Sequence, residues 1–249
     1  MTDLINRKRI IPVLLIHQYG LVKSKRFKDY TYVGDPVNAV RIFNDKEVDE
    51  IIILDIDASK AGRGPNFDFI AEITGEAFMP LAYGGGITQI EEAEKLFYNG
   101  VEKIILNTTL HTAGGLDLVR QIANRYGSQS IIASIDITRN LLGQQKIYNH
   151  STGKKSSMDI LDFCKQYQDA GCGEIILNSV SNDGMYTGYD INILSSVANQ
   201  VNIPVIICGG ASSVQDFRLA EQNGASAMAA GSMFVFQRPH NAVLISYDV

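Results

Sequence analysis

The sequence repeats itself at a fixed interval of 124 residues. Glu50-Ile-Ile-Ile-Leu corresponds to Glu174-Ile-Ile-Leu-Asn, and Met79-Pro-Leu-Ala-Tyr-Gly-Gly-Gly corresponds to Ile203-Pro-Val-Ile-Ile-Cys-Gly-Gly, since 174 − 50 and 203 − 79 both give 124. The same interval places Asn107-Thr108 over Gly231-Ser232. Self-similarity at a fixed period is typical of a structure built from repeated units. Any fold proposed for the chain therefore has to contain two equivalent halves.

Short apolar runs alternate with amphipathic stretches along the whole chain. The runs are apolar almost throughout, as expected for strands buried on both faces of a parallel sheet. Thr88-Gln-Ile-Glu91 predicts a capping box at one helix start, and Gly100, Gly171 and Gly224 follow three helices at left-handed positions. The expected strands are 9–15, 51–56, 79–83, 103–107, 131–136, 174–179, 204–208 and 227–231, and the expected helices are 36–46, 89–98, 116–125, 158–169, 191–199 and 214–222.

Eight strand–helix units predict either a closed barrel or a doubly wound sheet. The repeat favours the barrel, because a duplicated four-unit half closes naturally into eight strands. A doubly wound sheet gives no reason for equivalent glycine turns in both halves. We therefore expect the α/β class and a single (β/α)8 TIM barrel, with residues 1–249 as one domain and half-barrels of about 1–125 and 126–249. A length of 249 residues suits one such domain.

The chain is mildly acidic, with 22 Lys and Arg against 27 Asp and Glu and a formal net charge of −5. This balance argues against nucleic acid or an anionic membrane as the main partner, but not against a small anionic ligand. The three cysteines form an odd set without metal-type spacing, as expected for reduced thiols. No apolar segment of signal-peptide or membrane-span length is present, so we expect a cytoplasmic protein.

Two glycine turns stand at equivalent positions in the two halves. Gly84-Gly85-Gly86 follows the third expected strand and Gly209-Gly210 follows the seventh. In such barrels the ligand lies at the carboxyl ends of the strands, and glycines let backbone N–H groups approach phosphate oxygens. We therefore expect a phosphate site on each of two opposite rims, holding one elongated, doubly phosphorylated small molecule. The expected binding residues are Gly84, Gly85, Gly86, Asn107, Thr108, Asp55, Ser179, Gly184, Gly209, Gly210, Gly231 and Ser232.

Acidic residues fall on the same rim. Asp55 and Asp57 end the second strand, Asp136 ends the fifth, and Asp183 follows the sixth. Carboxylates at this rim are candidates for general acid/base catalysis, and the alternative for each is a hydrogen bond to a loop amide. Asp136 and Asp183 are the preferred catalytic candidates. No metal site is expected, because no His/Cys cluster has ligand spacing, and no cofactor is expected, because Gly84-Gly85-Gly86 lacks the dinucleotide-binding spacing.

Eight short motifs form a set that extends over essentially the whole chain. They are Gly34-Asp-Pro36, Leu54-Asp-Ile-Asp-Ala-Ser59, Gly84-Gly-Gly-Ile87, Asn107-Thr108, Tyr126-Gly-Ser-Gln129, Asp183-Gly184, Gly188-Tyr-Asp190 and Gly209-Gly-Ala211. Together they resemble the cyclase subunit of imidazole glycerol phosphate synthase, the HisF-type barrel of histidine biosynthesis. The related isomerase barrel shares the fold, but the motif at Tyr126 and the loop from Asp183 to Asp190 look like the cyclase.

The resemblance implies a lyase-type synthase subunit that receives ammonia from a separate, HisH-type glutaminase docked on the N-terminal face of the barrel. In that family the ammonia passes through the barrel core to a substrate with two phosphates, which agrees with the two-ended site. Two basic and two acidic residues close the bottom of the family's barrel, and all four match here as Arg9, Glu50, Lys103 and Glu174. Such ions are costly to bury unless they pair. A purely structural plug is the alternative to an ammonia gate.

One position departs from the family pattern. Cyclisation there uses two aspartates, at the ends of the first and fifth strands; the second matches Asp136, but the first falls on Leu15. Leucine cannot transfer a proton, and a general acid/base contributes typically about 10²–10⁴-fold, so ordinary cyclisation should be impaired. His17 is a candidate substitute because its pKa suits the task, although it is also an ordinary loop residue. Lys23 matches the family's flexible-loop lysine and is the third catalytic candidate.

Three functions remain open at this point. The first is an ordinary imidazole-forming synthase subunit, for which Leu15 is the weak point. The second is a related subunit that keeps the ammonia channel and phosphate sites but serves another acceptor, such as a sugar that is amidinated in surface-glycan biosynthesis. The third is a non-catalytic barrel that binds and activates the glutaminase. The loss of one carboxylate favours the second.

Overall fold

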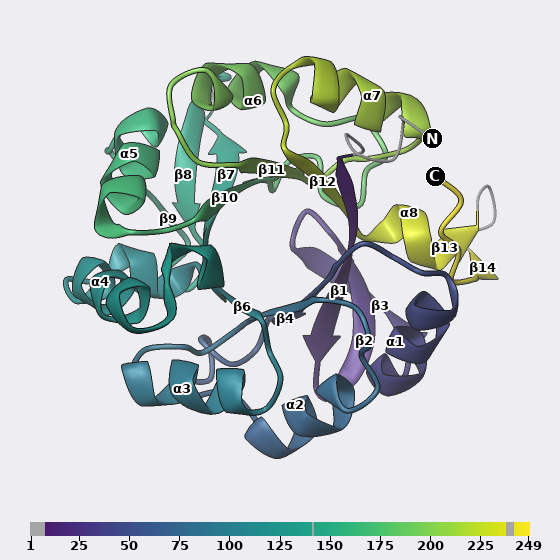
Figure 1. Cartoon of the computed structure of the whole chain (residues 1–249). Coiled ribbons are helices and arrows are strands. Elements are labelled where there is room, and N and C mark those ends of the chain that lie inside the picture. The colour runs from purple at the N-terminus through teal and green to yellow at the C-terminus, as the bar shows by residue number, and fades with distance from the viewer. Residues whose placement is uncertain (1–7, 141, 238–241) are drawn as a thin grey trace, which may run out of the picture.

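The computed structural model describes residues 8–140, 142–237 and 242–249. At its centre, eight parallel strands form a closed barrel, which Figure 1 shows along its axis. Pairing of β6 with β7 and of β12 with β1 joins the two halves, and four barrel strands lie in each half of the chain. Around the ring the strands are β1 (Arg9–His17), β4 (Ile51–Asp55), β5 (Leu81–Gly84), β6 (Lys103–Leu106), β7 (Ile131–Arg139), β10 (Glu174–Ser179), β11 (Val205–Cys208) and β12 (Ala227–Ala230).

Helices surround the barrel, and each turns an apolar face toward it (Figure 1). Local signals start and end them: Asp35 accepts a hydrogen bond from Asn38 N at one start, and Gly171 takes the left-handed conformation at one end. The expected capping box lies one residue later, where the side chain of Glu92 accepts a hydrogen bond from Gln89 N. The helices are α1 (Pro36–Asp45), α2 (Phe67–Thr74), α3 (Ile90–Tyr98), α4 (Gly115–Tyr126), α5 (Ile160–Ala170), α6 (Ile191–Ala198), α7 (Val214–Gln222) and α8 (Ser232–Val235).

The expected (β/α)8 barrel is confirmed, and its strands separate two apolar layers. Outward-facing residues pack under the helices, while a smaller cluster fills the barrel interior. Alternate residues of each strand belong to the inner cluster, as the two-residue period of a strand requires. The inner cluster consists of Ile11, Val13, Ile52, Ala82, Ile105, Ile132, Ile176, Ile206, Ala227 and Ala229.

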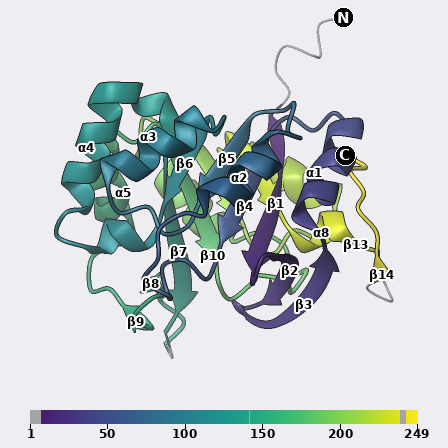
Figure 2. The same ribbon diagram turned by 90° about the horizontal axis from the view of Figure 1, so that it is seen from below.

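Two antiparallel hairpins, which the sequence patterns did not predict, extend from the carboxyl ends of barrel strands. One is formed by β2 (Gly20–Lys25) and β3 (Lys28–Gly34), the other by β8 (Gln145–Asn149) and β9 (Lys154–Lys155). Each continues the first strand of its half, so the duplication extends to this feature. Figure 2 shows both hairpins at the bottom of the molecule, at the opposite end from the start of β1.

The last part of the chain completes the wall beside the short helix α8. Leu244 N donates to Val235 O, and Ser246 N donates to Phe234 O. The ring of Tyr247 packs 5.3 Å from that of Phe234, and its hydroxyl donates to the Ile10 carbonyl at 2.8 Å. The two-stranded ribbon of β13 (Phe236–Gln237) and β14 (Ala242–Val243) leads into this segment. The C-terminal residues therefore connect α8 to the start of β1.

Candidate functional site

A cavity opens at the carboxyl ends of the barrel strands. Its empty volume is about 1330 Å³, which includes the space at its open mouth. Both glycine turns line it, and β5 and β6 lie across the ring from β11 and β12. The predicted residues that line this one cavity are Lys23, Asp55, Gly84, Gly85, Gly86, Asn107, Thr108, Asp136, Asp183, Gly184, Gly209, Gly210, Gly231 and Ser232.

The glycine turns follow paths that other residues would not tolerate. Gly85 has φ of 137°, and a Cβ there would lie 2.6 Å from Asp55 O. Gly209 has φ of 89°, and a Cβ there would lie 2.7 Å from Ser179 O. Both turns line the cavity, so their backbone lies where phosphate binding would require it. Ser179 itself is buried behind the Gly209 turn and, unlike the other expected binding residues, does not line the cavity.

Asp136 lies within β7, which continues three residues further than expected, and it is 5% exposed. Burial raises the pKa of this carboxyl to about 7, although hydrogen bonds from Asn107 and Asn178 oppose the rise and the nearby charge of Asp183 adds to it. A group that changes protonation near neutral pH can both take and give a proton. Asp136 can therefore exchange a proton near neutral pH, as expected of an acid/base at this position.

Lys23 reaches into the cavity from the β2–β3 hairpin. Its side chain is buried, and Nζ donates to the carbonyl of Val13. A Cβ on Gly231 would lie 2.7 Å from that nitrogen, so the amine borders the predicted phosphate turn after β12. Burial lowers the pKa of Lys23 to about 8, against the opposing influence of Asp183. The amine is thus mostly cationic at neutral pH and close to where a phosphate would bind.

Asp183 holds the same hairpin in place. Its Oδ2 accepts hydrogen bonds from Ser24 Oγ at 2.6 Å and Phe27 N at 3.3 Å, while its carbonyl accepts one from Arg26 N. Burial raises the pKa of this carboxyl, and these hydrogen bonds counteract the rise. Arg26 and Phe27 have φ of 53° and 61°, a strained conformation for residues with side chains. Asp183 therefore acts first as the anchor of the hairpin tip over the cavity.

Leu15 lines the cavity on the inner face of β1, where the resemblance implies an aspartate. His17, the possible substitute, is not among the lining residues. Its Nδ1 lies 2.8 Å from Asp57 Oδ1, and its ring stacks on Tyr30 with centroids 4.8 Å apart. His17 and Asp57 thus tie the first hairpin to the loop after β4. Their contacts give them a structural role.

Asp55 also has mainly structural contacts. Its Oδ1 accepts hydrogen bonds from the backbone of Asp57 and Ala58, each at 3.0 Å, and its Oδ2 pairs with Arg63 at 2.8 Å. These bonds shape the loop after β4, which backs the Gly85 turn. Asp55 therefore shapes the wall of the cavity beside the Gly85 turn.

Several lining residues escaped the sequence analysis, and three of them are Asn178, Cys208 and His150. Asn178 is next to Asp136 on the neighbouring strand, and Cys208, whose thiol pKa burial raises to about 12, follows on β11. His150 comes from the second hairpin and packs edge-on against Phe27 of the first, with ring centroids 5.3 Å apart. Inward alternation along β10 and β11 could have identified the first two. The hairpin contact had no signal in the sequence.

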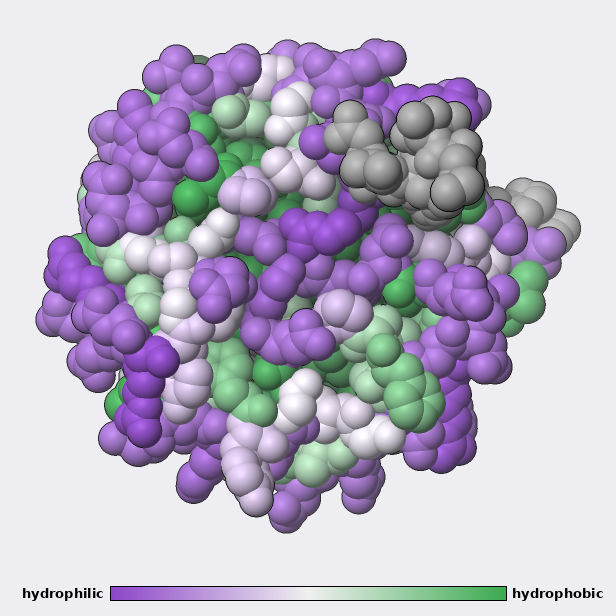
Figure 3. All heavy atoms as spheres, viewed as in Figure 1, coloured by the Kyte–Doolittle hydropathy of each residue, from purple (hydrophilic) through white to green (hydrophobic). Residues whose placement is uncertain are grey.

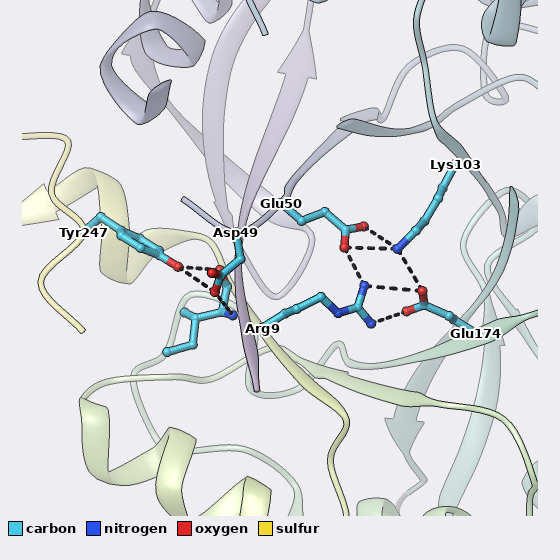
Figure 4. Close-up of polar contacts among 7 residues, drawn as sticks. Arg9, Asp49, Glu50, Lys103, Glu174 and Tyr247 are labelled. Atoms are coloured by element: carbon cyan, nitrogen blue, oxygen red, sulfur yellow. Dashed lines mark hydrogen bonds and ion pairs between the residues drawn. The ribbon is translucent and has the colours of Figure 1, made fainter. Parts of the chain in front are cut away.

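A ring of four charged side chains closes the opposite end of the barrel (Figure 4). Glu50 contacts Arg9 at 2.5 Å and Lys103 at 3.1 Å, and Glu174 contacts Arg9 at 2.6 Å and Lys103 at 2.8 Å. Burial disfavours the charges, yet hydrogen bonds and opposite charges raise the pKa of Arg9 and lower that of Glu174. The four residues predicted as a gate therefore form one closed, charge-balanced ring.

The surface around this ring mixes polar and apolar residues. Figure 3 views this end of the barrel, with hydrophilic spheres at the centre and apolar patches around them. Phe78, before β5, and Tyr98, at the end of α3, are 89% and 92% exposed. Large aromatic side chains in such positions are typical of contact surfaces for other proteins.

Two kinds of feature are absent from the part of the chain that the structure describes. Within residues 8–140, 142–237 and 242–249, no group of three or more His, Cys, Asp or Glu side chains is arranged to hold a metal ion. Among the helices in those ranges, none is both long and apolar enough to cross a membrane.

Comparison with known proteins gives a consistent family. Residues 9–239 match the family described as "Histidine biosynthesis protein". A Pseudomonas aeruginosa protein with the provisional name imidazole glycerol phosphate synthase subunit hisF2 is 48% identical over 97% of this chain and 96% of its own length. A Vibrio vulnificus protein provisionally named subunit hisF3 is 44% identical (97% and 93%), and subunit HisF of Alkaliphilus metalliredigens is 36% identical (91% and 90%). The chain therefore belongs to the histidine biosynthesis protein family, among relatives named as the HisF subunit of imidazole glycerol phosphate synthase.

Proposed function

We propose that this chain is the synthase subunit of an ammonia-dependent complex, which adds nitrogen to a small molecule with a phosphate at each end. The observation that carries this proposal is one cavity with two opposed glycine turns and a buried acid/base, above a barrel closed at its other end by the charge ring. The relatives named HisF support the same reaction type.

Each part of the site would have a separate task in this reaction. Backbone amides at Gly85 and Gly209 would hold the two phosphates, and the ammonium of Lys23 would neutralise the one beside Gly231. Asp136 would move protons between the incoming nitrogen and the substrate, since its pKa lies near neutrality. The hairpin that Asp183 anchors would keep water out of the cavity.

The nitrogen would arrive from the ring end of the barrel. We propose that a glutaminase subunit binds the face with the ring and with the exposed side chains of Phe78 and Tyr98. Ammonia released there would pass the ring and then the inner cluster, whose members are all Ile, Val or Ala. An apolar passage admits neutral ammonia and excludes ammonium, because an unpaired charge is costly to bury.

Leu15 favours a changed acceptor over ordinary imidazole formation. It lines the cavity and cannot transfer a proton, and His17 turns its Nδ1 to Asp57. An acceptor that needs only one acid/base, such as a sugar amide that is amidinated, would be compatible with Asp136 alone. This is the more specific form of the proposal. It predicts that the ordinary reaction is slow in the natural chain.

The test is turnover with ammonium and the bisphosphorylated precursor of imidazole glycerol phosphate. We expect little product from the natural chain and at least a tenfold gain for Leu15→Asp, because a restored acid/base contributes about 10²–10⁴-fold. Leu15→Asn is the matched control, since it has the shape of the aspartate but no transferable proton. Fast turnover by the natural chain would contradict the changed acceptor. Failure of the precursor to bind any variant would contradict the two-phosphate site.

A further inference from the structure

Asp136 has a polar neighbour on the adjacent strand that the proposed reaction does not yet use. Asn178 pairs with Asp136 in the register of β10 and β7, and its Nδ2 donates to Asp136 Oδ1 at 3.2 Å. Both residues line the cavity. The same Asn178 pairs with Cys208 on the other side, so the three residues occupy one level of the barrel mouth.

The other end of the Asn178 side chain faces the glycine turn after β11. A Cβ on Gly209 would lie 3.1 Å from Asn178 Oδ1. One amide group therefore spans from the acid/base to the predicted phosphate turn. Its orientation is fixed chemically, because only the NH₂ end can donate to a carboxylate.

A second amide contacts Asp136 from the strand on its other side. Asn107 Nδ2 donates to Ser134 O at 2.9 Å, and its side chain also forms a hydrogen bond with the carboxyl of Asp136. An amide nitrogen has two hydrogens, so both contacts are compatible. Asp136 therefore lies between two amide donors, one from each neighbouring strand.

We propose that Asn178 is a positioning residue of the site, which fixes the carboxyl of Asp136 against the glycine turn at Gly209 and stabilises its ionised form. This deepens the proposed function, since it assumes that Asp136 is the reacting acid/base. Without the Asn178 donor, the buried carboxyl would rotate more freely and would ionise only at higher pH.

Other ionisable groups face Asp136 and have to be kept constant in a test. Asp183, from the loop after β10, raises its pKa, and the thiol of Cys208 on β11 interacts electrostatically with it. Lys23, from the first hairpin, interacts with both Asp183 and Cys208. None of these side chains changes in the variants below.

The experiment is a carbon-13 NMR titration of the Asp136 carboxyl in the full chain, with the signal assigned by its loss in Asp136→Asn. Asn178→Val removes the donor. Asn178→Thr is the matched control, because threonine has nearly the same shape as valine but keeps a hydroxyl donor. We expect a midpoint about one pH unit higher for the Val variant and close to the natural chain for the Thr variant. Circular dichroism verifies that both variants are folded.

Two results would overturn the proposal. If Val and Thr variants titrate alike, the hydrogen bond has no effect and Asn178 only fills space. If the Val variant titrates at or below the midpoint of the natural chain, the Asn178 amide does not stabilise the ionised form of Asp136. Because the titration needs no substrate, it also separates this inference from the proposed function, which would fail in the turnover assay instead.

Discussion

Removal of one charge from the ring at the closed end of the barrel should destabilise the whole protein. The substitution is Glu50→Gln, which keeps the shape of the side chain and leaves Arg9 and Lys103 without half of their partners. Glu50 is suited to this test because its side chain is 3% exposed and contacts both cations.

The magnitude follows from the burial of the ring. Loss of one partner of a fully buried ion pair costs about 3–5 kcal/mol, since an uncompensated charge stays behind. The side chain of Arg9 is 30% exposed, so water screens part of that cost and we expect about 2–3 kcal/mol. For a domain of this size 1 kcal/mol corresponds to about 2–4 °C, which predicts a melting temperature about 4–12 °C lower.

The assay is thermal unfolding at pH 7 and low ionic strength. Glu76→Gln is the matched control, because it breaks the exposed pair with Arg41 and should melt within about 1 °C of the natural chain. The double variant Glu50→Gln with Arg9→Met removes one charge of each sign and should recover part of the loss. If Glu50→Gln melts together with the control, the ring adds no stability and the electrostatic argument is wrong.

Two further predictions concern the open end of the barrel. Burial raises the pKa of Asp136 to about 7, so the folded state binds this proton more tightly than the unfolded state, and stability falls as pH rises from about 4 to about 7. The melting temperature of Asp136→Asn, measured relative to that of the natural chain, should therefore be higher at pH 8 than at pH 5. The same difference at both pH values would refute the assignment. Asp183→Ala removes the hydrogen bonds to Ser24 and Phe27, so the amides of β2 and β3 should exchange at least about tenfold faster, while unchanged exchange would show that the hairpin needs no anchor.

The barrel strands could be predicted because both of their faces are buried. Every residue of a run such as 131–136 is buried, including the polar Ser134 and Asp136. The near-continuous apolar pattern of such runs, together with the repeat, predicts the closed ring. Six helices were predicted from their amphipathic patterns. Helix α2 was missed because its apolar residues follow a segment rich in glycine and proline, and α8 because it has only four residues.

The β2–β3 hairpin could not be predicted, for a different reason. Short hairpin turns are usually recognised by glycine or asparagine at left-handed positions. Here Gln18, Tyr19, Arg26 and Phe27 take those positions, with φ between 48° and 64°. Tertiary contacts, such as those from Asp183, hold them there, and no local pattern encodes such contacts.

The rule that ligands bind at the carboxyl ends of barrel strands located most of the cavity wall, but it did not identify the tasks of the residues there. It grouped Asp55 and Asp57 with Asp136, although the first two bind loop backbone and His17. It also overlooked Asn178, because an amide carries no charge that suggests catalysis. Which carboxylates remain available depends on the side chains around them, and these come together only in the folded chain.

The contact between Tyr247 and β1 has a consequence for the order in which the protein is assembled during translation. The strand β1 leaves the ribosome long before its partner β12 and the tyrosine that binds Ile10 O. Until then one side of β1 is an unpaired edge, a hazard for aggregation that a chaperone or the first hairpin would have to cover. Chains that stop short of Tyr247 should leave that edge weakly held even after β12 has docked.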